Sequence, residues 1–205
     1  MAIEHFDFAP DFVFSPQPAY MIGTNNEDST PNFCLITWIG FSADEGPCLM
    51  MTIGGSKLTK TNILREGRFS ANMVTEDTLW LADYFGTTRG EERAKTAVNY
   101  TIERGHKVDV PVLGESHWIY ECEVDRHVPL EGADLFIARI LNIQIDQAYQ
   151  KMDMEKIDLQ QIRPVIYSPY VYNSIGEKTG EPGQWKEHLK PVEDVDVRFE
   201  KADEK

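Results

Sequence analysis

Two long runs in the C-terminal half of the chain alternate with a period of two residues, and this alternation constrains the fold more than any other feature. In residues 118–125 (WIYECEVD), aromatic and apolar residues at even positions alternate with mainly acidic ones. In residues 135–145 (LFIARILNIQI), apolar residues recur at odd positions. A period of two is typical of β-strands, and Gly132 in the connection suits a hairpin turn. The pattern therefore predicts a long antiparallel strand pair.

Shorter apolar runs predict the rest of the architecture. The elements expected earlier in the chain are strands at 19–25, 33–41, 48–55 and 68–74 and helices at 59–67 and 79–86. Thr59 is expected to be the N-cap of the first helix and Gly67 its stop, and a further short helix is expected around residues 92–98. Six or so strands with only short helices predict a mainly β fold, an antiparallel barrel with helical insertions. A Rossmann fold is disfavoured because strands and long helices do not alternate.

Length and charge bound the domain organisation and the partners. The 205 residues suit one domain, expected at 1–190, followed by an acidic tail at 191–205 that is mobile or lies across a partner subunit. The formal net charge of −14 opposes binding to nucleic acid and to anionic membranes, so neither is an expected partner. The first residues carry acids and no continuous apolar run, which argues against a signal peptide or a membrane span and predicts a cytoplasmic protein.

Residue types that often carry metal or hydrolytic chemistry are poorly placed for it. The three cysteines lie in apolar runs without Cys-x-x-Cys spacing, so buried reduced thiols are expected. The five histidines show no ligand spacing, and no Gly-x-Ser-x-Gly motif is present. The acidic pairs Glu91–Glu92 and Glu121–Glu123 are expected on solvated faces instead of forming an acid–base couple.

The segment GGSKLTKTNI, residues 54–63, combines the features of a phosphate cradle. Two glycines allow close backbone approach, Ser56 and Thr59 offer hydroxyls, and Lys57 supplies a positive charge. The first turn of the following helix presents free backbone N–H groups to the same space. A glycine-ended strand followed by an ordinary capped helix would explain the same residues, so both interpretations stay open. A Walker A loop is excluded by the spacing.

Several segments occur in an order that resembles the flavin reductase-like, FMN-binding split-barrel family, which includes the flavoredoxins. They are, in chain order, AYMIGTNNEDSTPNFCLITWIGF, SKLTKTNI, GRFSANMV, LADYFG and PVLGESHWIYECEV. The later segment PVIYSPYVYNSIGEKTG resembles the family's Tyr-x-x-Ile/Leu-Gly-Glu element. The resemblance covers roughly residues 12–180. It implies a Greek-key antiparallel split β-barrel that works as a homodimer with one FMN in each subunit.

The resemblance also implies which residues contact the cofactor. One strand would lie along the ribityl chain and isoalloxazine ring, and the proposed cradle would bind the phosphate. The implied contacts are Asn32, Ile36, Thr37 and Trp38 along the strand, and Ser56, Lys57, Thr59 and Asn62 at the phosphate. Core packing is the alternative role for Trp38. For Asn72, the alternative to cofactor contact is satisfaction of the local backbone.

One position departs from the family pattern. Many flavin reductases carry Gly-x-His at the hairpin before the last long strand, near the flavin and the nicotinamide, whereas this chain has Gly132, Ala133 and Asp134. The departure argues against direct oxidation of NAD(P)H, and a carboxylate of Asp134 facing the site would repel a dinucleotide. The leading hypothesis is an FMN-dependent oxidoreductase that uses NAD(P)H or exchanges electrons with a redox protein partner. The alternatives are a non-catalytic flavin-binding or storage protein, and a split barrel that binds another small molecule.

Overall fold

The computed structural model describes residues 3–88 and 98–188. The chain divides into two units, Met1–Ile175 and Gly176–Lys205. In the second unit, the described part holds one short 3₁₀ helix, η4 (Gln184–His188). The acidic tail expected at 191–205, and all but the last residue of the helix expected at 92–98, lie outside the described residues. The domain boundary expected at residue 190 therefore stays a prediction.

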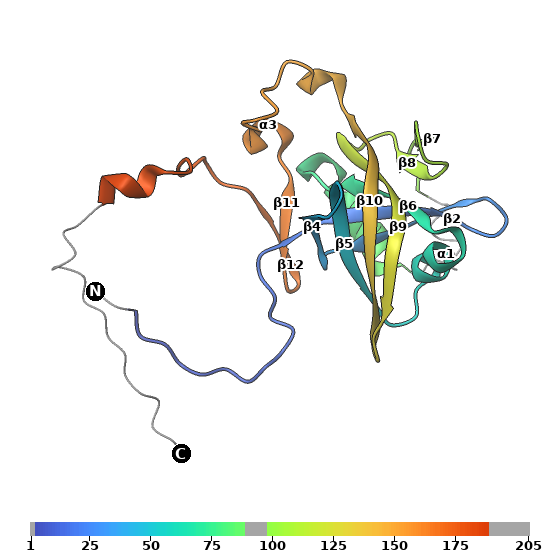
Figure 1. Ribbon diagram of the computed structural model, residues 1–205, viewed down its shortest axis with the longest axis horizontal. Coiled ribbons are helices and arrows are strands. Elements are labelled where there is room, and N and C mark those ends of the chain that lie inside the picture. Colours follow the sequence, from blue (N-terminus) through green and yellow to red (C-terminus); the bar gives the residue numbers. More distant parts are fainter. Residues whose placement is uncertain (1–2, 89–97, 189–205) are drawn as a thin grey trace. The chain divides into compact units, whose positions relative to one another are not determined.

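Strands dominate the first unit, and its helices are short (Figure 1). The strands are β1 (Gln17–Pro18), β2 (Tyr20–Asn25), β3 (Pro31–Ile36), β4 (Ile39–Ala43), β5 (Pro47–Gly54), β6 (Arg68–Met73), β7 (Ile102–Arg104), β8 (Pro111–Leu113), β9 (Trp118–Pro129), β10 (Ala133–Ile145), β11 (Val165–Ser168) and β12 (Val171–Ser174). The helices are α1 (Leu58–Glu66), α2 (Leu79–Thr87) and α3 (Leu159–Ile162), with 3₁₀ helices η1 (Glu76–Thr78) and η3 (Gln147–Tyr149).

Seven strands form one antiparallel sheet in the order β3-β2-β6-β9-β10-β5-β4. Side chains from every strand of this sheet meet in a single core, to which α1 adds Ile63. Ile22, Phe69 and Phe136 are among its fully buried members. A sheet whose strands all face one shared core is curled around it, which is the barrel geometry expected from the sequence. Two smaller sheets, β1-β11-β12 and β7-β8, complete the strand pairing.

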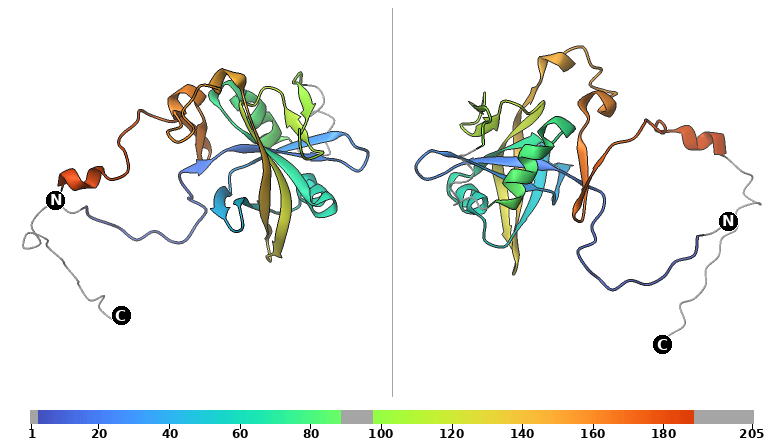
Figure 2. Two further views of the ribbon diagram at one scale, coloured as in Figure 1. Left: turned by 45° about the horizontal axis from the view of Figure 1, so that its top comes forward. Right: turned by 180° about the vertical axis from the view of Figure 1, so that it is seen from behind.

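A second core lies on the other face of β2 and β3, beneath α2. The right-hand view of Figure 2 shows α2, in green, lying against the blue β2. Met21 and Phe33 pack there against Leu81 and Phe85 of α2. Because β2 packs on both faces, all six of its residues are buried. At its centre Gly23 has no room for a side chain, since an added Cβ would lie 2.4 Å from the carbonyl oxygen of Pro111.

The single strand expected at 33–41 is two strands in the structure, and that prediction is wrong. β3 ends at Ile36 and β4 begins at Ile39, with a tight turn in which the Ile39 N–H donates to Thr37 O (3.0 Å). The reason is topological. β3 pairs with β2 at one edge of the sheet, whereas β4 pairs with β5 at the other edge, so the chain has to cross between edges. This crossing exposes Trp38.

The helix expected at 59–67 exists, but it begins before Thr59. Its N-cap is Lys57, and Thr59 lies within the first turn with its hydroxyl accepting a hydrogen bond from Asn32 (2.8 Å). That buried partner explains why Thr59 does not cap the helix. The expected C-terminal stop is confirmed: Gly67 adopts a left-handed conformation with φ of 66°.

The long strand pair is confirmed as β9 and β10, and its hairpin closes with Leu130 N–H donating to Ala133 O (2.9 Å). Phe136 and Ala138 of β10 are buried in the barrel core. The odd-numbered apolar residues noted in the sequence lie on the other face, where Leu141 and Ile143 are 45% and 44% exposed. An apolar stripe of β10 is therefore left open to contact.

The cysteines agree with the expectation of buried thiols. Cys34, Cys48 and Cys122 are free and buried. Within the described residues, no group of three or more His, Cys, Asp or Glu side chains could hold a metal ion. Among the described helices, none has both the length and the apolar character needed to cross a membrane.

Candidate functional site

A cavity of about 200 Å³ opens where the β3–β4 crossing passes the end of β5 and the start of α1. It is lined by Leu35, Ile36, Thr37, Trp38, Thr52, Gly54 and Lys57. Its position follows from the topology, because the Thr52 N–H donates to Trp38 O (2.8 Å) and so holds the crossing against β5. The cavity thus combines an exposed tryptophan, two threonines and a lysine.

Two glycines keep the backbone open at the end of β5. A Cβ added at Gly54 would lie 3.6 Å from the indole of Trp38, so the tryptophan lies close over this position. Gly55 has a φ of 64° and nothing within 4 Å of an added Cβ, and its N–H donates to Gly132 O (3.0 Å). The strand end is therefore fixed to the β9–β10 hairpin while the space in front of Gly55 stays free.

The start of α1 carries unbalanced positive potential. No side chain caps the helix, and its N-cap is Lys57. Ser56 and Lys57 are exposed, and no carboxylate of the described residues pairs with Lys57. Backbone N–H groups at a helix start and an unpaired ammonium group both favour an anion. Ser56 adjoins this position in the chain, so the region fits a phosphate group.

Three other residues predicted at the phosphate or the ring lie in a buried polar network. The Asn32 side-chain amide donates to the hydroxyls of Thr59 (2.8 Å) and Thr24 (3.2 Å). Asn62 donates to Thr24 (3.1 Å) and to Asn26 Oδ1 (2.9 Å). These hydrogen bonds join β2, β3 and α1, so the network fixes the helix that carries Lys57. Contact of Asn32, Thr59 or Asn62 with a cofactor stays a prediction.

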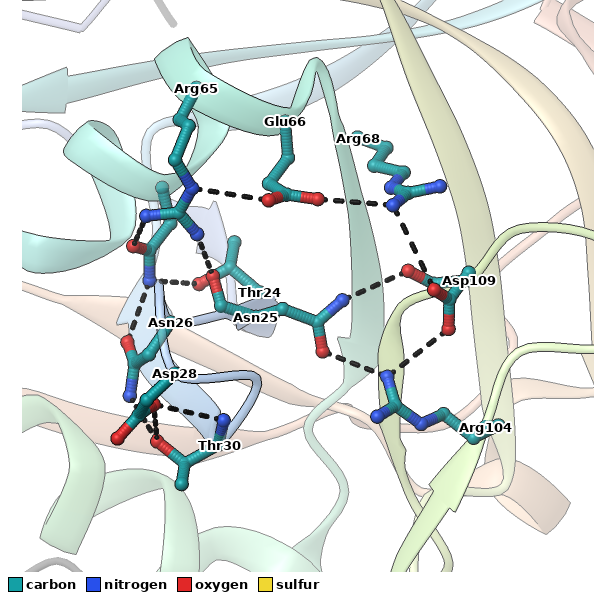
Figure 3. A network of polar contacts seen from close by, with 11 residues as sticks. Thr24, Asn25, Asn26, Asp28, Thr30, Arg65, Glu66, Arg68, Arg104 and Asp109 are labelled. Atoms are coloured by element: carbon teal, nitrogen blue, oxygen red, sulfur yellow. Dashed lines mark hydrogen bonds and ion pairs between the residues drawn. The ribbon is translucent and has the colours of Figure 1, made fainter.

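Figure 3 shows how this network continues towards the surface. Arg65 donates to Asn25 O (2.6 Å) and to Asn62 Oδ1 (3.1 Å). Arg104 donates to Asn25 Oδ1 (2.9 Å) and pairs with Asp109 (3.2 Å). The end of β2 is thereby tied both to the end of α1 and to β7. The orientation of α1 is consequently held at both of its ends.

The hairpin carboxylate, Asp134, is already paired within the chain. Its two oxygens lie 2.7 Å from Lys60 Nζ and 2.6 Å from His127 Nε2, and its side chain is 15% exposed. The hydrogen bond from Lys60 and then that from His127 hold the pKa of Asp134 below its usual range. The carboxylate is therefore ionised and neutralised locally.

The strand register places this carboxylate on the far side from the cavity. Asp134 is paired with Ile53, whose side chain is in the barrel core, whereas Ala133 is paired with Gly54, which lines the cavity. Paired residues of antiparallel strands point to the same face. The repulsion expected if Asp134 faced the site is thus absent, and Ala133 is the hairpin residue on the same face as Gly54.

Two polar residues discussed at the sequence level have structural roles. Asn72 is fully buried: its amide donates to Met21 O (2.8 Å) and its carbonyl accepts from the Leu113 N–H (3.0 Å). These hydrogen bonds satisfy backbone groups of β2 and β8, which favours the second of the two roles expected for Asn72. Glu121, expected on a solvated face, is fully buried instead. That expectation is wrong for Glu121, although Glu123 is exposed beside Arg139.

Glu121 stays ionised in the interior because many donors surround it. Burial alone would raise the pKa of Glu121, but the hydrogen bonds together outweigh burial and lower that pKa to about 2. The donors are the side-chain amides of Asn142 and Gln144 and the backbone N–H groups of His106, Lys107 and Val108. The carboxylate therefore anchors the loop at 105–108 onto β9.

Of the eight predicted contacts, the structure brings Ile36, Thr37, Trp38 and Lys57 to one cavity, with Ser56 beside them in the chain. Sequence reasoning missed Leu35 and Thr52 as lining residues. The signal for Thr52 was present, since it is the one hydroxyl-bearing residue in the apolar run CLMMTIGG. Its parity points it away from the core occupied by Met51 and Ile53.

A sequence profile for the family described as "Flavin reductase like domain" matches residues 13–176. Similar solved structures include the flavoredoxin of Desulfovibrio vulgaris (Miyazaki F), with a TM-score of 0.79 at 23% identity over 88% of this chain and 98% of that one. The flavoredoxin of Methanosarcina acetivorans has a TM-score of 0.81 at 21% identity, over 91% and 100% of the two chains.

A third similar structure is the FMN-binding protein of Thermus thermophilus with bound 1-cyclohex-2-enone. Its TM-score is 0.71 at 22% identity, over 89% of this chain and 99% of that one. No curated protein matches the sequence significantly. At these identities the structural matches establish a shared fold, and the predicted mainly β split barrel with short helices is confirmed.

Proposed function

The chain belongs to the flavin reductase-like family, and from this premise we propose that it is an FMN-dependent oxidoreductase that works as a homodimer. One observation carries the proposal: a single cavity has a tryptophan and two threonines on its walls and ends at an unpaired lysine beside an uncapped helix start. Such a cavity offers one region for a planar ring and another for a phosphate. FMN contains both groups. The names of similar FMN-binding proteins also suggest a flavin ligand.

At the phosphate end, Lys57 and the first backbone N–H groups of α1 would bind the anion, with Ser56 as a further hydroxyl donor. In a chain of net charge −14, this local positive potential has to overcome general repulsion. The buried network of Asn32, Thr59 and Asn62 supports the proposal indirectly, because it fixes the helix whose start binds the phosphate.

At the ring end, Ile36, Thr37, Trp38 and Thr52 would hold the isoalloxazine and ribityl groups. The two hydroxyls and the backbone of the crossing offer donors and acceptors, and Trp38 offers an apolar surface. FMN, when bound, supplies the electron-transfer chemistry, whereas the protein orients it and sets its surroundings. The hollow is open to solvent, and its volume of about 200 Å³ is below the usual size of a ligand site, about 300–1,000 Å³.

That small volume supports the homodimer part of the proposal. A cofactor that protrudes from one subunit needs a second wall, and a second copy of the chain would supply it. The exposed apolar residues of β10, Leu141 and Ile143, offer contact surface for such a copy. Buried free thiols fit a reducing compartment, so we place the protein in the cytoplasm.

The electron donor is the least constrained part of the proposal. NAD(P)H and a reduced redox protein are the two candidates, and the alanine that the hairpin presents to the cavity favours the protein partner. The same observation keeps a non-catalytic flavin-binding or storage protein as the second candidate function. The two differ in whether any physiological donor reduces the bound flavin.

The decisive experiment is an absorbance spectrum of freshly purified protein, followed by release and identification of any flavin. We expect a flavin spectrum and release of FMN in a ratio of one per subunit. Protein that is colourless and takes up no added FMN would refute the proposal. Protein that binds FMN but leaves it oxidised with NADH, NADPH and reduced carrier proteins would be a storage protein.

A further inference from the structure

A second cavity, of about 400 Å³, adjoins the candidate cofactor site. It is lined by Phe14, Pro16, Gln17, Pro18, Thr37, Trp38, Ile39 and Thr52. Thr37, Trp38 and Thr52 are common to both cavities, so the two share the wall formed by the β3–β4 crossing. A molecule in the second cavity would lie directly beside the ring end of the first.

Two of the residues that line this cavity, Phe14 and Trp38, are aromatic, and they come from distant parts of the chain. Phe14 meets Trp38 edge to face, with ring centroids 5.8 Å apart at 63°. Phe12 lies nearly parallel to the same tryptophan, with centroids 5.9 Å apart at 12°. Although Phe12 and Phe14 belong to an exposed segment, they pack against the one aromatic residue that lines both cavities. An aromatic cluster of this kind favours planar rings.

Phe14 is held in place by the neighbouring strand. The Gln17 side-chain amide donates to Phe14 O (2.5 Å), and Gln17 itself is only 8% exposed. Gln17 also begins β1, which is paired with β11 through Tyr167. This hydrogen bond and the ring contact with Trp38 hold Phe14 in place, although its side chain is 49% exposed and that of Phe12 is 69% exposed.

The lining residues exclude most charged ligands. None of the eight carries a charge, so these walls offer no ionic partner to a carboxylate or a pyrophosphate. The hydroxyls of Thr37 and Thr52 can donate hydrogen bonds to a carbonyl oxygen. A cavity of about 150 Å³ is enough to hold benzene, so this one has room for one or two fused rings.

From these observations we infer that the second cavity is a binding site for an uncharged, planar aromatic carbonyl compound. Phe14 and Trp38 form its apolar walls, and the compound lies next to the cofactor. The inference rests on the proposed function only for the identity of that neighbour, because the aromatic walls and the absence of charge are properties of the lining residues themselves.

The probe is coumarin, a planar, uncharged two-ring carbonyl compound, titrated into FMN-loaded protein by calorimetry. We expect saturable binding with one site per subunit that does not displace FMN. Replacement of Phe14 by alanine should weaken coumarin binding about tenfold while the FMN dissociation constant changes less than twofold. Phe8→Ala, in the same segment but outside the aromatic cluster, is the matched control and should change neither.

Other results would overturn the inference. Competition between coumarin and FMN would mean that the second cavity belongs to the cofactor. Equal binding of 2-naphthoate, a charged planar analogue, would refute the selection against charge. Equal effects of Phe8→Ala and Phe14→Ala on coumarin binding would refute the role of Phe14 as a wall of the cavity. If Phe14→Ala fails to fold, Phe14→Leu, which keeps the apolar volume without the ring, should still weaken binding about threefold.

The test separates this inference from the proposed function. Coumarin binding to flavin-free protein can be followed by tryptophan fluorescence, with Trp38→Phe identifying the signal from the cavity. Phe14-dependent binding in a protein that takes up no FMN would sink the proposed function and leave the second site standing. FMN uptake without any coumarin binding would sink the second site alone.

Discussion

At the residue scale, the candidate site depends on a cation that has no ionic partner among the described residues. Asp134, Glu121 and Asn72 all looked available in the sequence, yet each is engaged by neighbours in the folded unit. Lys57 is the opposite case, since no described carboxylate lies within ion-pair distance of its amino group although the chain carries 34 acidic residues. An unpaired cation that lines a cavity beside an uncapped helix start is expected to bind an anionic ligand.

Replacement of Lys57 by alanine should weaken FMN binding by about 1.5–3 kcal/mol, or roughly ten- to a hundredfold in Kd, the range of a charge-assisted hydrogen bond. Riboflavin lacks the phosphate, so its affinity should hardly change. Fluorescence titration of the flavin-free protein measures both. Lys156→Ala, which removes the same charge from another exposed position, is the control. Unchanged FMN affinity in Lys57→Ala would contradict the phosphate assignment.

Glu121 should make the fold sensitive to acid. Its pKa is about 2 in the folded chain and 4.5 ordinarily. A carboxyl with a lowered folded-state pKa stabilises fully above its unfolded pKa, and this stabilisation is lost as pH falls from about 4.5 towards 2. Glu121→Gln should cost about 3 kcal/mol at pH 7, because it breaks a buried charged network.

Urea unfolding of both proteins at pH 7 and pH 3 tests this prediction. The difference in the free energy of unfolding between wild type and Glu121→Gln should shrink at the lower pH, because protonation of the wild-type carboxyl removes part of its stabilising effect there. Glu123→Gln, on the exposed side of the same strand, should have little effect at either pH. A pH-independent difference would argue against ionised Glu121 as the source.

At the element scale, local patterns predicted the strands and helices well but not how they cross. β2, β5, β6, α2 and the β9–β10 hairpin follow from apolar runs and glycines, because those signals act within a few residues. The break between β3 and β4 was missed because Phe33–Phe41 is continuously β-rich. What breaks it is pairing with strands at opposite sheet edges, which is a long-range property.

The candidate site was predictable to a similar extent. The glycines and Lys57 predict the phosphate end from local sequence alone. The family resemblance predicted Thr37 and Trp38 as cofactor contacts. The polar network of Asn32, Thr59 and Asn62 could not be predicted from sequence, because the hydrogen bonds from Asn32 to Thr59 and from Asn62 to Thr24 span 27 and 38 positions. The second cavity was likewise hidden, since it brings Phe14 against Trp38 and Thr52.

Two glycines provide a matched test of the β5–α1 connection. Gly55 and Gly67 have φ values of 64° and 66°, and an added Cβ meets nothing within 4 Å at either position. Alanine at each should therefore destabilise the protein similarly, by about 1 kcal/mol, through backbone strain alone. Only Gly55 adjoins the proposed phosphate position, so only Gly55→Ala should also weaken FMN binding. Thermal unfolding and FMN titration of both variants check this. Equal FMN affinities of the two variants would refute phosphate binding beside Gly55.

The β9–β10 hairpin carries a prediction about the electron donor. Ala133 faces the cavity side and offers no polar group to position a nicotinamide, and such positioning can contribute several kcal/mol to a barrier. Reduction of bound FMN by NADH or NADPH should therefore be slow, whereas dithionite or a reduced carrier protein should reduce it readily. Stopped-flow bleaching of the flavin absorbance measures this. Rapid, saturable bleaching by either nicotinamide would favour a flavin reductase instead.

At the scale of the whole molecule, several exposed apolar side chains offer a surface that a second copy of the chain would cover. Leu141 and Ile143 lie on β10, and Tyr170 and Trp185 are 96% and 63% exposed in the C-terminal region. The sheet that carries β10 also carries β5, which ends at the candidate site. Dimerisation through this sheet would therefore cover apolar surface and bring a second wall towards the cofactor.

Sedimentation at micromolar concentration should give about twice the mass of one chain. Ile143→Asp should shift the protein towards monomer, because it places a charge in the proposed interface. Ile102→Asp is the matched control, since Ile102 on β7 has the same 44% exposure and should leave the mass unchanged. A monomeric wild type would contradict the dimer.

The burial of the thiols affects how well such a protein resists oxidation by the peroxide that a reduced flavin generates in air. A reduced flavin exposed to air generates peroxide close to the polypeptide, and peroxide attacks cysteine as the thiolate. Cys34, Cys48 and Cys122 are all buried, Cys34 and Cys122 in the barrel core, and burial raises the pKa of the Cys122 thiol far above neutrality. The barrel that shapes the cofactor site thus also shields its most oxidisable side chains, and repeated turnover in air should leave all three thiols titratable after denaturation.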